Sequence, residues 1–245
     1  MKVLAIESSA VTASVAIMTE DTLIAEYTIN YKKTHSQTLL PMIDEICRMT
    51  ETDVSDIDIV AVSDGPGSFT GLRIGAATGK GIALAKDKPM VAVPTLEAMA
   101  YNLMGDKRLI CPVMDARRQH LYSGLYRFDA EKLEIIHEQC LISYQELVDI
   151  LNAQDEEVVF VGDGIDVAGD YIKDNLKCRY SFSKPHIKTQ RASSVALAAI
   201  YIPQYPAISP VCSHTRYMLS GLHAASMKDF SDHGSENISF SIFDT

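Results

Sequence analysis

The sequence predicts an α/β protein of two similar lobes, and three observations support this. Both halves of the 245-residue chain show the same order of apolar patterns: three strands, a helix, a strand and a second helix. Each half also places a glycine turn after its fourth strand, Gly65-Pro66-Gly67 in the first and Gly162-Asp163-Gly164 in the second. With 47% hydrophobic residues, the chain can bury the core that two lobes need.

The first half begins with strands joined by a polar hairpin loop at 8–12. Its strands are expected at 3–7, 14–18, 23–29, 57–62 and 90–93. The first helix is expected on apolar residues at helical spacing: Leu39, Leu40, Ile43, Ile46 and Cys47. Residues 34–38 offer several N-cap candidates for this helix, and Pro41 fits its first turn or a kink.

A glycine-rich segment at 63–80, SDGPGSFTGLRIGAATGK, predicts a tight turn from the fourth strand into the second helix. Gly65 and Gly67 can adopt positive φ, and Ser68 or Thr70 can cap the helix. Small residues then recur at a spacing of four, which places them on one face: Gly71, Gly75, Gly79 and Ala83. Each interior glycine costs about 1 kcal/mol relative to alanine, so the face is expected to allow close approach, either of the chain's own sheet or of a helix in another chain.

The second half repeats this order. Its strands are expected at 109–114, 120–128, 133–141 and 158–161. The capping box formed by Ser143 and Glu146 begins its first helix, and a second helix is expected at about 167–176. A further helix at about 194–201 is expected to return to the first lobe.

A duplicated β-β-β-α-β-α unit is the ground plan of the actin-like ATPase (RNase H-like) fold of actin, hexokinase and Hsp70, in which a nucleotide lies between two lobes. We therefore expect an N-terminal lobe at 1–104, to which 192–219 return, and a C-terminal lobe at 105–191. The last segment, 220–245, has scattered Ser, His and Gly without clear periodicity, and we expect it to be a poorly ordered, divergent tail.

Composition excludes several classes of protein. The formal net charge of −10 disfavours tight binding of nucleic acid by this chain alone. No apolar run approaches the roughly 20 residues of a membrane span, so we expect a cytoplasmic protein without a membrane partner. The five cysteines are widely spaced, which suggests neither a disulfide framework nor a zinc site: Cys47, Cys111, Cys140, Cys178 and Cys212.

Four stretches carry a specific resemblance: VLAIESSAVTASVAI, HSQTLLPMI, GPGSFTGLRIGAATGKGIALA and DARRQHLYSGLY. Over residues 1–202 the chain resembles the TsaB family, also called YeaZ. The resemblance implies a non-catalytic scaffold that joins a TsaD-like catalytic paralogue and a TsaE-like ATPase to form threonylcarbamoyladenosine beside the anticodon of tRNAs that read ANN codons. It also implies a homodimer in isolation, contact with tRNA through the complex, and ATP or ADP with Mg²⁺ in the partner subunits.

Several residues occupy places where an actin-like fold would face a nucleotide, and we expect them to form a degenerate site: Glu7, Ser8, Ser9, Gly65, Gly67, Asp115, Gly162 and Gly164. Glu7 could hold a magnesium-bound water, or it could be a strand-end carboxylate in solvent. For Asp115, an ion pair within the Asp115-Ala116-Arg117-Arg118 turn is the expected role.

A peptidase function is an alternative because relatives of this family were once labelled glycoproteases. None of the seven histidines forms H-x-x-x-H or H-E-x-x-H, and Ser68 lacks the G-x-S-x-G elbow, so no catalytic residue and no metal ligand is assigned. His35 is expected to cap or pack the helix that it enters. The alternatives that remain are a stand-alone actin-fold ATPase or transferase and a metallopeptidase-like hydrolase.

A scaffold needs a surface for its partners, and we expect the two helices of the first lobe to supply it. The glycine-rich helix and the preceding helix would together bind a second copy or the paralogue. Met42, with Thr38, Glu45 and Met49, marks a second helical face suited to adaptable contacts. The expected interface residues are Leu39, Met42, Ile43, Ile46, Gly71, Leu72, Gly75, Gly79 and Ala83.

Overall fold

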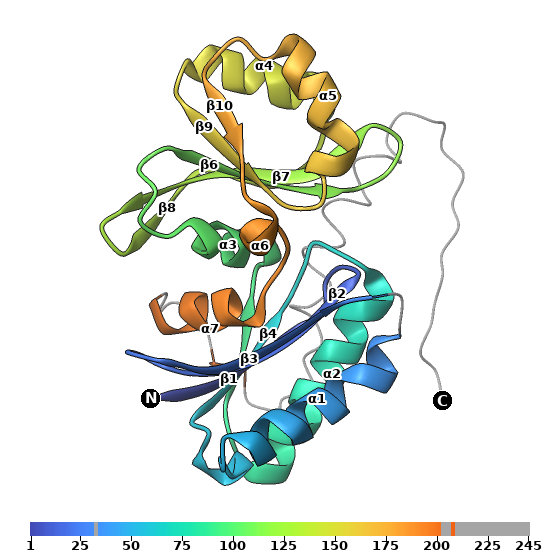
Figure 1. Cartoon of the computed structure of the whole chain (residues 1–245), viewed down its shortest axis with the longest axis vertical. Coiled ribbons are helices and arrows are strands. Elements are labelled where there is room, and N and C mark those ends of the chain that lie inside the picture. Colours follow the sequence, from blue (N-terminus) through green and yellow to red (C-terminus); the bar gives the residue numbers. More distant parts are fainter. Residues whose placement is uncertain (32–33, 202–206, 209–245) are drawn as a thin grey trace, which may run out of the picture.

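A computed structural model of the chain describes residues 1–31, 34–201 and 207–208. These residues form two β-sheets, one in the lower and one in the upper half of Figure 1, with three short helices between them. The tail expected at 220–245 lies outside the described residues, as does most of the segment expected to return to the first lobe after residue 201.

The first sheet has the strand order β11-β5-β4-β1-β2-β3. Strands β1, β2 and β3 form an antiparallel meander, whereas β4 runs parallel to β1 and β5 parallel to β4. The bounds are Lys2–Glu7 for β1, Thr12–Thr19 for β2, Leu23–Asn30 for β3, Ile59–Ser63 for β4, Met90–Val93 for β5 and Ala207–Ile208 for β11.

The second sheet repeats this topology in the order β10-β9-β6-β7-β8. Again three strands form an antiparallel meander, and the fourth and fifth run parallel to the first. The bounds are Leu109–Asp115 for β6, His120–Asp129 for β7, Lys132–Ser143 for β8, Val158–Val161 for β9 and Tyr180–Phe182 for β10. Two copies of this arrangement confirm the predicted actin-like ATPase fold, although β10 was not expected.

Long helices cover the outer face of each sheet, and short helices fill the space between the sheets (Figure 1). The first sheet carries α1 (His35–Met49) and α2 (Phe69–Lys86). The second carries α4 (Tyr144–Gln154) and α5 (Ile165–Asn175). Between the sheets lie α3 (Thr95–Ala100), α6 (Pro185–Lys188) and α7 (Ala192–Tyr201), and two 3₁₀ helices span Val54–Asp56 and Tyr101–Leu103.

The alternation of strand side chains explains these layers. In β1, Leu4 and Ile6 pack into the core beneath α1 and α2, whereas Val3 and Ala5 face the core that contains α3 and α7. The central core also takes side chains from the second sheet, such as Ile110 and Phe128. One apolar core therefore joins the inner faces of both sheets.

Side-chain caps that the sequence predicts begin α2 and α4. The Ser143–Glu146 capping box is present, with the Ser143 Oγ accepting from the Glu146 N–H at 3.2 Å. Ser68 caps α2 and accepts from the Gly71 N–H at 3.2 Å. Pro41 lies inside α1 beyond its first turn, and the helix nevertheless continues to Met49.

The glycine face of α2 packs against the chain's own sheet. A Cβ at Gly71 would lie 2.1 Å from the Ser8 carbonyl oxygen, one at Gly75 would lie 2.2 Å from the Ser8 Oγ, and one at Gly79 would lie 2.6 Å from Val62. Such approaches are closer than any side chain tolerates. Of the two expected roles for this face, packing within the chain is the one observed.

The expected interface therefore needs correction. All nine residues assigned to it are buried inside the chain, because they form the inner faces of α1 and α2: Leu39, Met42, Ile43, Ile46, Gly71, Leu72, Gly75, Gly79 and Ala83. Of the second face expected on α1, Thr38 and Met42 are buried inside the chain, whereas Glu45 is half-buried and Met49 is 61% exposed. Helical spacing identified a face of each helix correctly but did not reveal what the face contacts.

Candidate functional site

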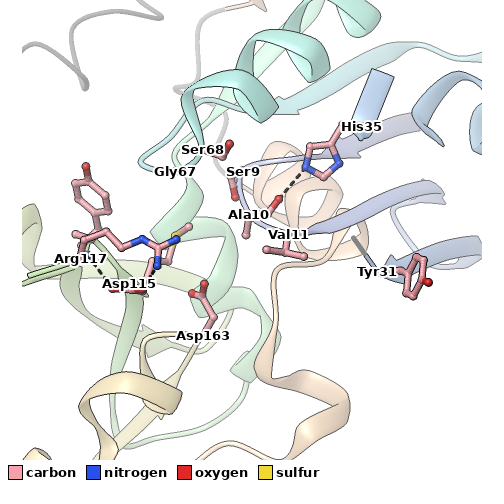
Figure 2. A pocket seen from close by; sticks show the side chains of 13 residues that line it. Ser9, Ala10, Val11, Tyr31, His35, Gly67, Ser68, Asp115, Arg117 and Asp163 are labelled. Carbon is pink, nitrogen blue, oxygen red and sulfur yellow. Dashed lines mark hydrogen bonds and ion pairs between the residues drawn. The ribbon is translucent and has the colours of Figure 1, made fainter. Parts of the chain in front are cut away.

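A cavity of about 580 Å³ opens between the two lobes (Figure 2). One wall comes from the β1–β2 hairpin, the start of α1 and the turn before α2. The other comes from the β6–β7 hairpin and the turn before α5. The lining residues are Ser9, Ala10, Val11, Tyr31, His35, Gly67, Ser68, Met114, Asp115, Ala116, Arg117, Tyr122 and Asp163.

The first-lobe wall is held together by backbone contacts between the β1–β2 hairpin and the Gly-Pro-Gly turn. The Ser68 N–H donates to the Ser9 carbonyl at 2.6 Å, and a Cβ at Gly67 would lie 2.3 Å from the same oxygen. Gly65 and Gly67 have φ of 102° and 157°, as their sequence predicts. His35 adds a hydrogen bond of 2.8 Å from its Nε2 to the Ala10 carbonyl. His35 is therefore a packing residue, and Thr34 holds the N-cap position of α1.

Glu7 and Ser8 lie beneath this wall and do not line the cavity. Glu7 is buried, and its Oε1 accepts from the Ser9 N–H at 2.6 Å. Burial raises the pKa of Glu7, although hydrogen bonds from Ser9 and other serines lower it. The Ser8 Oγ donates to the Gly71 carbonyl at 3.0 Å, which ties β1 to α2. The alternative of a solvent-exposed Glu7 is thus wrong.

In the second lobe, Asp115 and Asp163 face the cavity (Figure 2). Asp115 accepts from the Arg117 N–H at 2.8 Å and pairs with the Arg117 guanidinium at 3.6 Å, as expected of this turn. Burial raises the pKa of Asp163, and the nearby Asp115 and Asp166 carboxylates raise it further. Three successive residues of the hairpin, Arg117 to Gln119, have φ between 50° and 70°, which is a strained conformation for residues other than glycine.

The structure thus brings three of the eight expected residues together around the cavity: Ser9, Gly67 and Asp115. Gly65 supports its turn, while Gly162 and Gly164 allow close packing on Val113 of β6. Asp163 and His35 also line the cavity, although neither was expected there. The position of Asp163 between Gly162 and Gly164 was a signal in the sequence for its place at the cavity.

The cavity is lined by both acidic and basic side chains. Asp115 and Asp163 face it, and Arg117, which also lines it, is paired with Asp115. Within residues 1–31, 34–201 and 207–208, no group of three or more His, Cys, Asp or Glu side chains is placed to hold a metal ion. The same part of the chain contains no helix that is long and apolar enough to cross a membrane.

The duplicated sheets and the cavity between them define a two-lobed protein of the actin-like ATPase fold. YeaZ from Pseudomonas aeruginosa has this fold as well: it superposes with a TM-score of 0.72 at 21% identity, over 85% of this chain and 95% of that chain. The family model described as TsaD, tRNA N6-adenosine threonylcarbamoyltransferase, matches residues 22–242.

Closer sequence relatives specify the family. The tRNA threonylcarbamoyladenosine biosynthesis protein TsaB of Bacillus subtilis is 35% identical over 176 residues, 72% of this chain and 77% of that protein. Its counterpart from Escherichia coli is 34% identical over 154 residues, 57% of this chain and 66% of that protein. The chain belongs to the TsaB (YeaZ) family.

Proposed function

We propose that this chain is a non-catalytic scaffold and activator in the cytoplasmic complex that forms threonylcarbamoyladenosine on tRNA. Its partners would be a TsaD-like catalytic paralogue and a TsaE-like ATPase. The observation that carries the proposal is membership of the TsaB family, whose relatives are named for threonylcarbamoyladenosine biosynthesis. The net charge of −10 is consistent with contact to tRNA through the complex and not by this chain alone.

The state of the inter-lobe site favours a scaffold over a stand-alone ATPase. Glu7 could have held a magnesium-bound water, but its side chain is buried and its carboxylate accepts a hydrogen bond from the Ser9 N–H. The ATP or ADP and Mg²⁺ required by the complex would therefore bind in the partner subunits.

A surface for partners is available on the outer side of α1 and α2, which pack against each other. Its apolar side chains are Leu40, Phe69 and Leu84, which are 56%, 50% and 47% exposed. Gly81 lies on the same outer side of α2, and a Cβ there would meet nothing within 4 Å. A glycine inside a helix costs about 1 kcal/mol relative to alanine, and no contact among the described residues requires a glycine at position 81. Close approach of a helix from another chain would explain its presence.

The test is binding of the purified chain to its TsaD-like paralogue. Gly81→Leu places a bulky side chain in the proposed contact, and we expect it to weaken the heterodimer at least tenfold by isothermal titration. Ala153→Leu makes a similar addition on the exposed side of α4 in the other lobe and should change affinity less than twofold. Equal affinity of wild type and Gly81→Leu, with unchanged melting temperatures, would exclude this surface. No binding by the wild type would exclude the scaffold function.

The same surface would form the homodimer, so the two assemblies should compete. Sedimentation velocity of the chain alone should show a dimer, which converts to a heterodimer when the paralogue is added. A ternary species that keeps the homodimer intact would show that two different surfaces are used.

A further inference from the structure

Two segments of the chain cross between the lobes. The first crossing, 94–108, contains α3 and the 3₁₀ helix Tyr101–Leu103, and the second, 183–191, contains α6. Both lie between the two sheets, together with α7 (Figure 1). Helix α3 packs on α7, which lies against the first sheet, and also on β6 and β7 of the second sheet. A change in the angle between the lobes must therefore bend both crossings and slide α3 against α7 or against the second sheet.

Asn102 joins the two crossings to each other. Its Nδ2 donates to the Ile187 carbonyl at 2.8 Å and to the Thr189 carbonyl at 2.9 Å, and its Oδ1 accepts from the Ser194 Oγ at the start of α7. An asparagine amide has two N–H donors and one carbonyl oxygen, and all three are used here. One side chain of the first crossing thus holds the second crossing at three points. Bending of either crossing alone would break these hydrogen bonds.

The end of the second crossing is fixed to the first sheet as well. Glu26 of β3 accepts from the Ser193 N–H at 2.9 Å, from the Ser193 Oγ at 2.7 Å and from the Arg191 Nε at 3.1 Å. The Glu26 side chain is only 8% exposed, so these charge-assisted bonds are shielded from water. Between these two residues, the Ala192 N–H donates to the Ser14 Oγ at 3.1 Å. The chain is therefore anchored to β2 and β3 where it enters the first lobe.

Apolar contacts join the lobes at the same place. Tyr101 is 3% exposed, and its ring lies 5.1 Å from that of Phe128 on β7 and 6.5 Å from that of Tyr201 on α7. Rotation of one lobe would separate Tyr101 from one of these rings and expose part of the central core to water. Close-packed cores adopt discrete arrangements and do not deform continuously.

We propose that Asn102 is the pin of an inter-lobe lock, which makes the two lobes move as one rigid body and keeps the cavity at one width. The cavity of about 580 Å³ is then preformed, and its two walls keep their separation whether or not a ligand or partner is bound. Asn102 acts here as a positioning residue, through the crossings that it joins. The proposal does not depend on the scaffold function.

Electron–electron distance measurements on the full chain test this proposal. Nitroxide labels would be attached through p-acetylphenylalanine at positions 37 and 167, two exposed positions on α1 and α5 in different lobes, which leaves the native cysteines unchanged. We expect one distance distribution in the wild type, no wider than the rotamers of the labels require. Asn102→Ala should widen it by about half or more, because both crossings are released.

Asn152→Ala is the matched control. Asn152 also holds two backbone groups, the Asn175 carbonyl at 3.3 Å and the Lys177 N–H at 2.7 Å, but all three residues belong to the second lobe. This variant should leave the distribution unchanged. Equal widening in both variants would show general loosening, and several distances in the wild type, or no widening in Asn102→Ala, would overturn the proposal.

Hydrogen exchange supplies an independent readout and identifies the segment that is released. In Asn102→Ala the amides of Ala192 and Ser193 should exchange about tenfold faster than in the wild type, and those of α4 should not change. Faster exchange without a wider distance distribution would show that Asn102 orders only the second crossing, which would contradict the lock. Thermal melts establish that each variant is folded. If Asn102→Ala does not fold, Ser194→Ala, which removes one of the three hydrogen bonds, takes its place under the same criteria.

Discussion

Substitution of Gly75 by alanine tests how α2 is fitted to its sheet. The new Cβ would lie 2.2 Å from the Ser8 Oγ and 3.3 Å from the Ser8 Cβ. Ser8 is buried and holds the Gly71 carbonyl through its hydroxyl at 3.0 Å. Its side chain must rotate or α2 must move outward, and either change breaks this hydrogen bond.

The magnitude follows from three contributions. Alanine in place of glycine stabilises a helix interior by about 1 kcal/mol. Overpacking a buried contact costs about 1 to 3 kcal/mol, and loss of the hydrogen bond costs about 1 kcal/mol more. We therefore expect Gly75→Ala to lower the free energy of unfolding by about 1 to 3 kcal/mol.

Gly81 provides a control within the same helix, because its Cβ would meet nothing within 4 Å. Gly81→Ala should raise the free energy of unfolding by up to about 1 kcal/mol. Urea denaturation followed by circular dichroism measures both. The double variant Ser8→Ala/Gly75→Ala lacks the Ser8 Oγ, the atom nearest to the new Cβ. Its loss of free energy of unfolding should therefore be smaller than the sum of the losses in the two single variants. A Gly75→Ala protein at least as stable as the wild type would refute the packing described for this face.

Three further predictions concern single side chains. Burial acts to raise the pKa of Glu26, but hydrogen bonds from Arg191 and Ser193 outweigh it, so the pKa is lowered. Glu26→Ala should therefore lower the free energy of unfolding by about 2 kcal/mol in urea denaturation at pH 7. This loss should become smaller as the pH falls below 4.5. Burial raises the pKa of Asp64 to about 6, so this carboxyl should destabilise the wild type progressively as the pH rises from about 4 to 6. Asp64→Asn lacks this effect, so thermal melts should show the melting temperature of the wild type falling relative to that of Asp64→Asn over this pH range. Ser143→Ala removes the capping box of α4 and should cost about 1 kcal/mol in the same denaturation assay.

Repetition made the architecture predictable from the sequence. The period-2 and period-3.6 patterns occur in the same order twice, and they persist over segments long enough to be read, such as α1 and α2. Strand β10 was missed because its three residues, Tyr180–Phe182, are too few to establish alternation. The short helices α3 and α6 were missed for the same reason.

The surroundings of each element were harder to predict. A spacing of four showed that Gly71, Gly75 and Gly79 share a face, but the partner of that face, Ser8 and Val62, is set by the tertiary fold. The cavity posed a similar difficulty, because His35 and Asp163 are brought together by folding from different lobes and belong to no common motif.

Reconstitution of the modification reaction tests the central claim most directly. The TsaD-like paralogue, the TsaE-like ATPase, tRNA and threonylcarbamoyl-adenylate would be combined with and without this chain, and modified adenosine would be counted over several turnovers. A scaffold acts by raising the population of a competent partner state, so we predict multi-turnover modification with the wild type or Glu7→Ala, and its loss when the chain is omitted or carries Gly81→Leu. Equal modification in the absence of the chain would contradict the account.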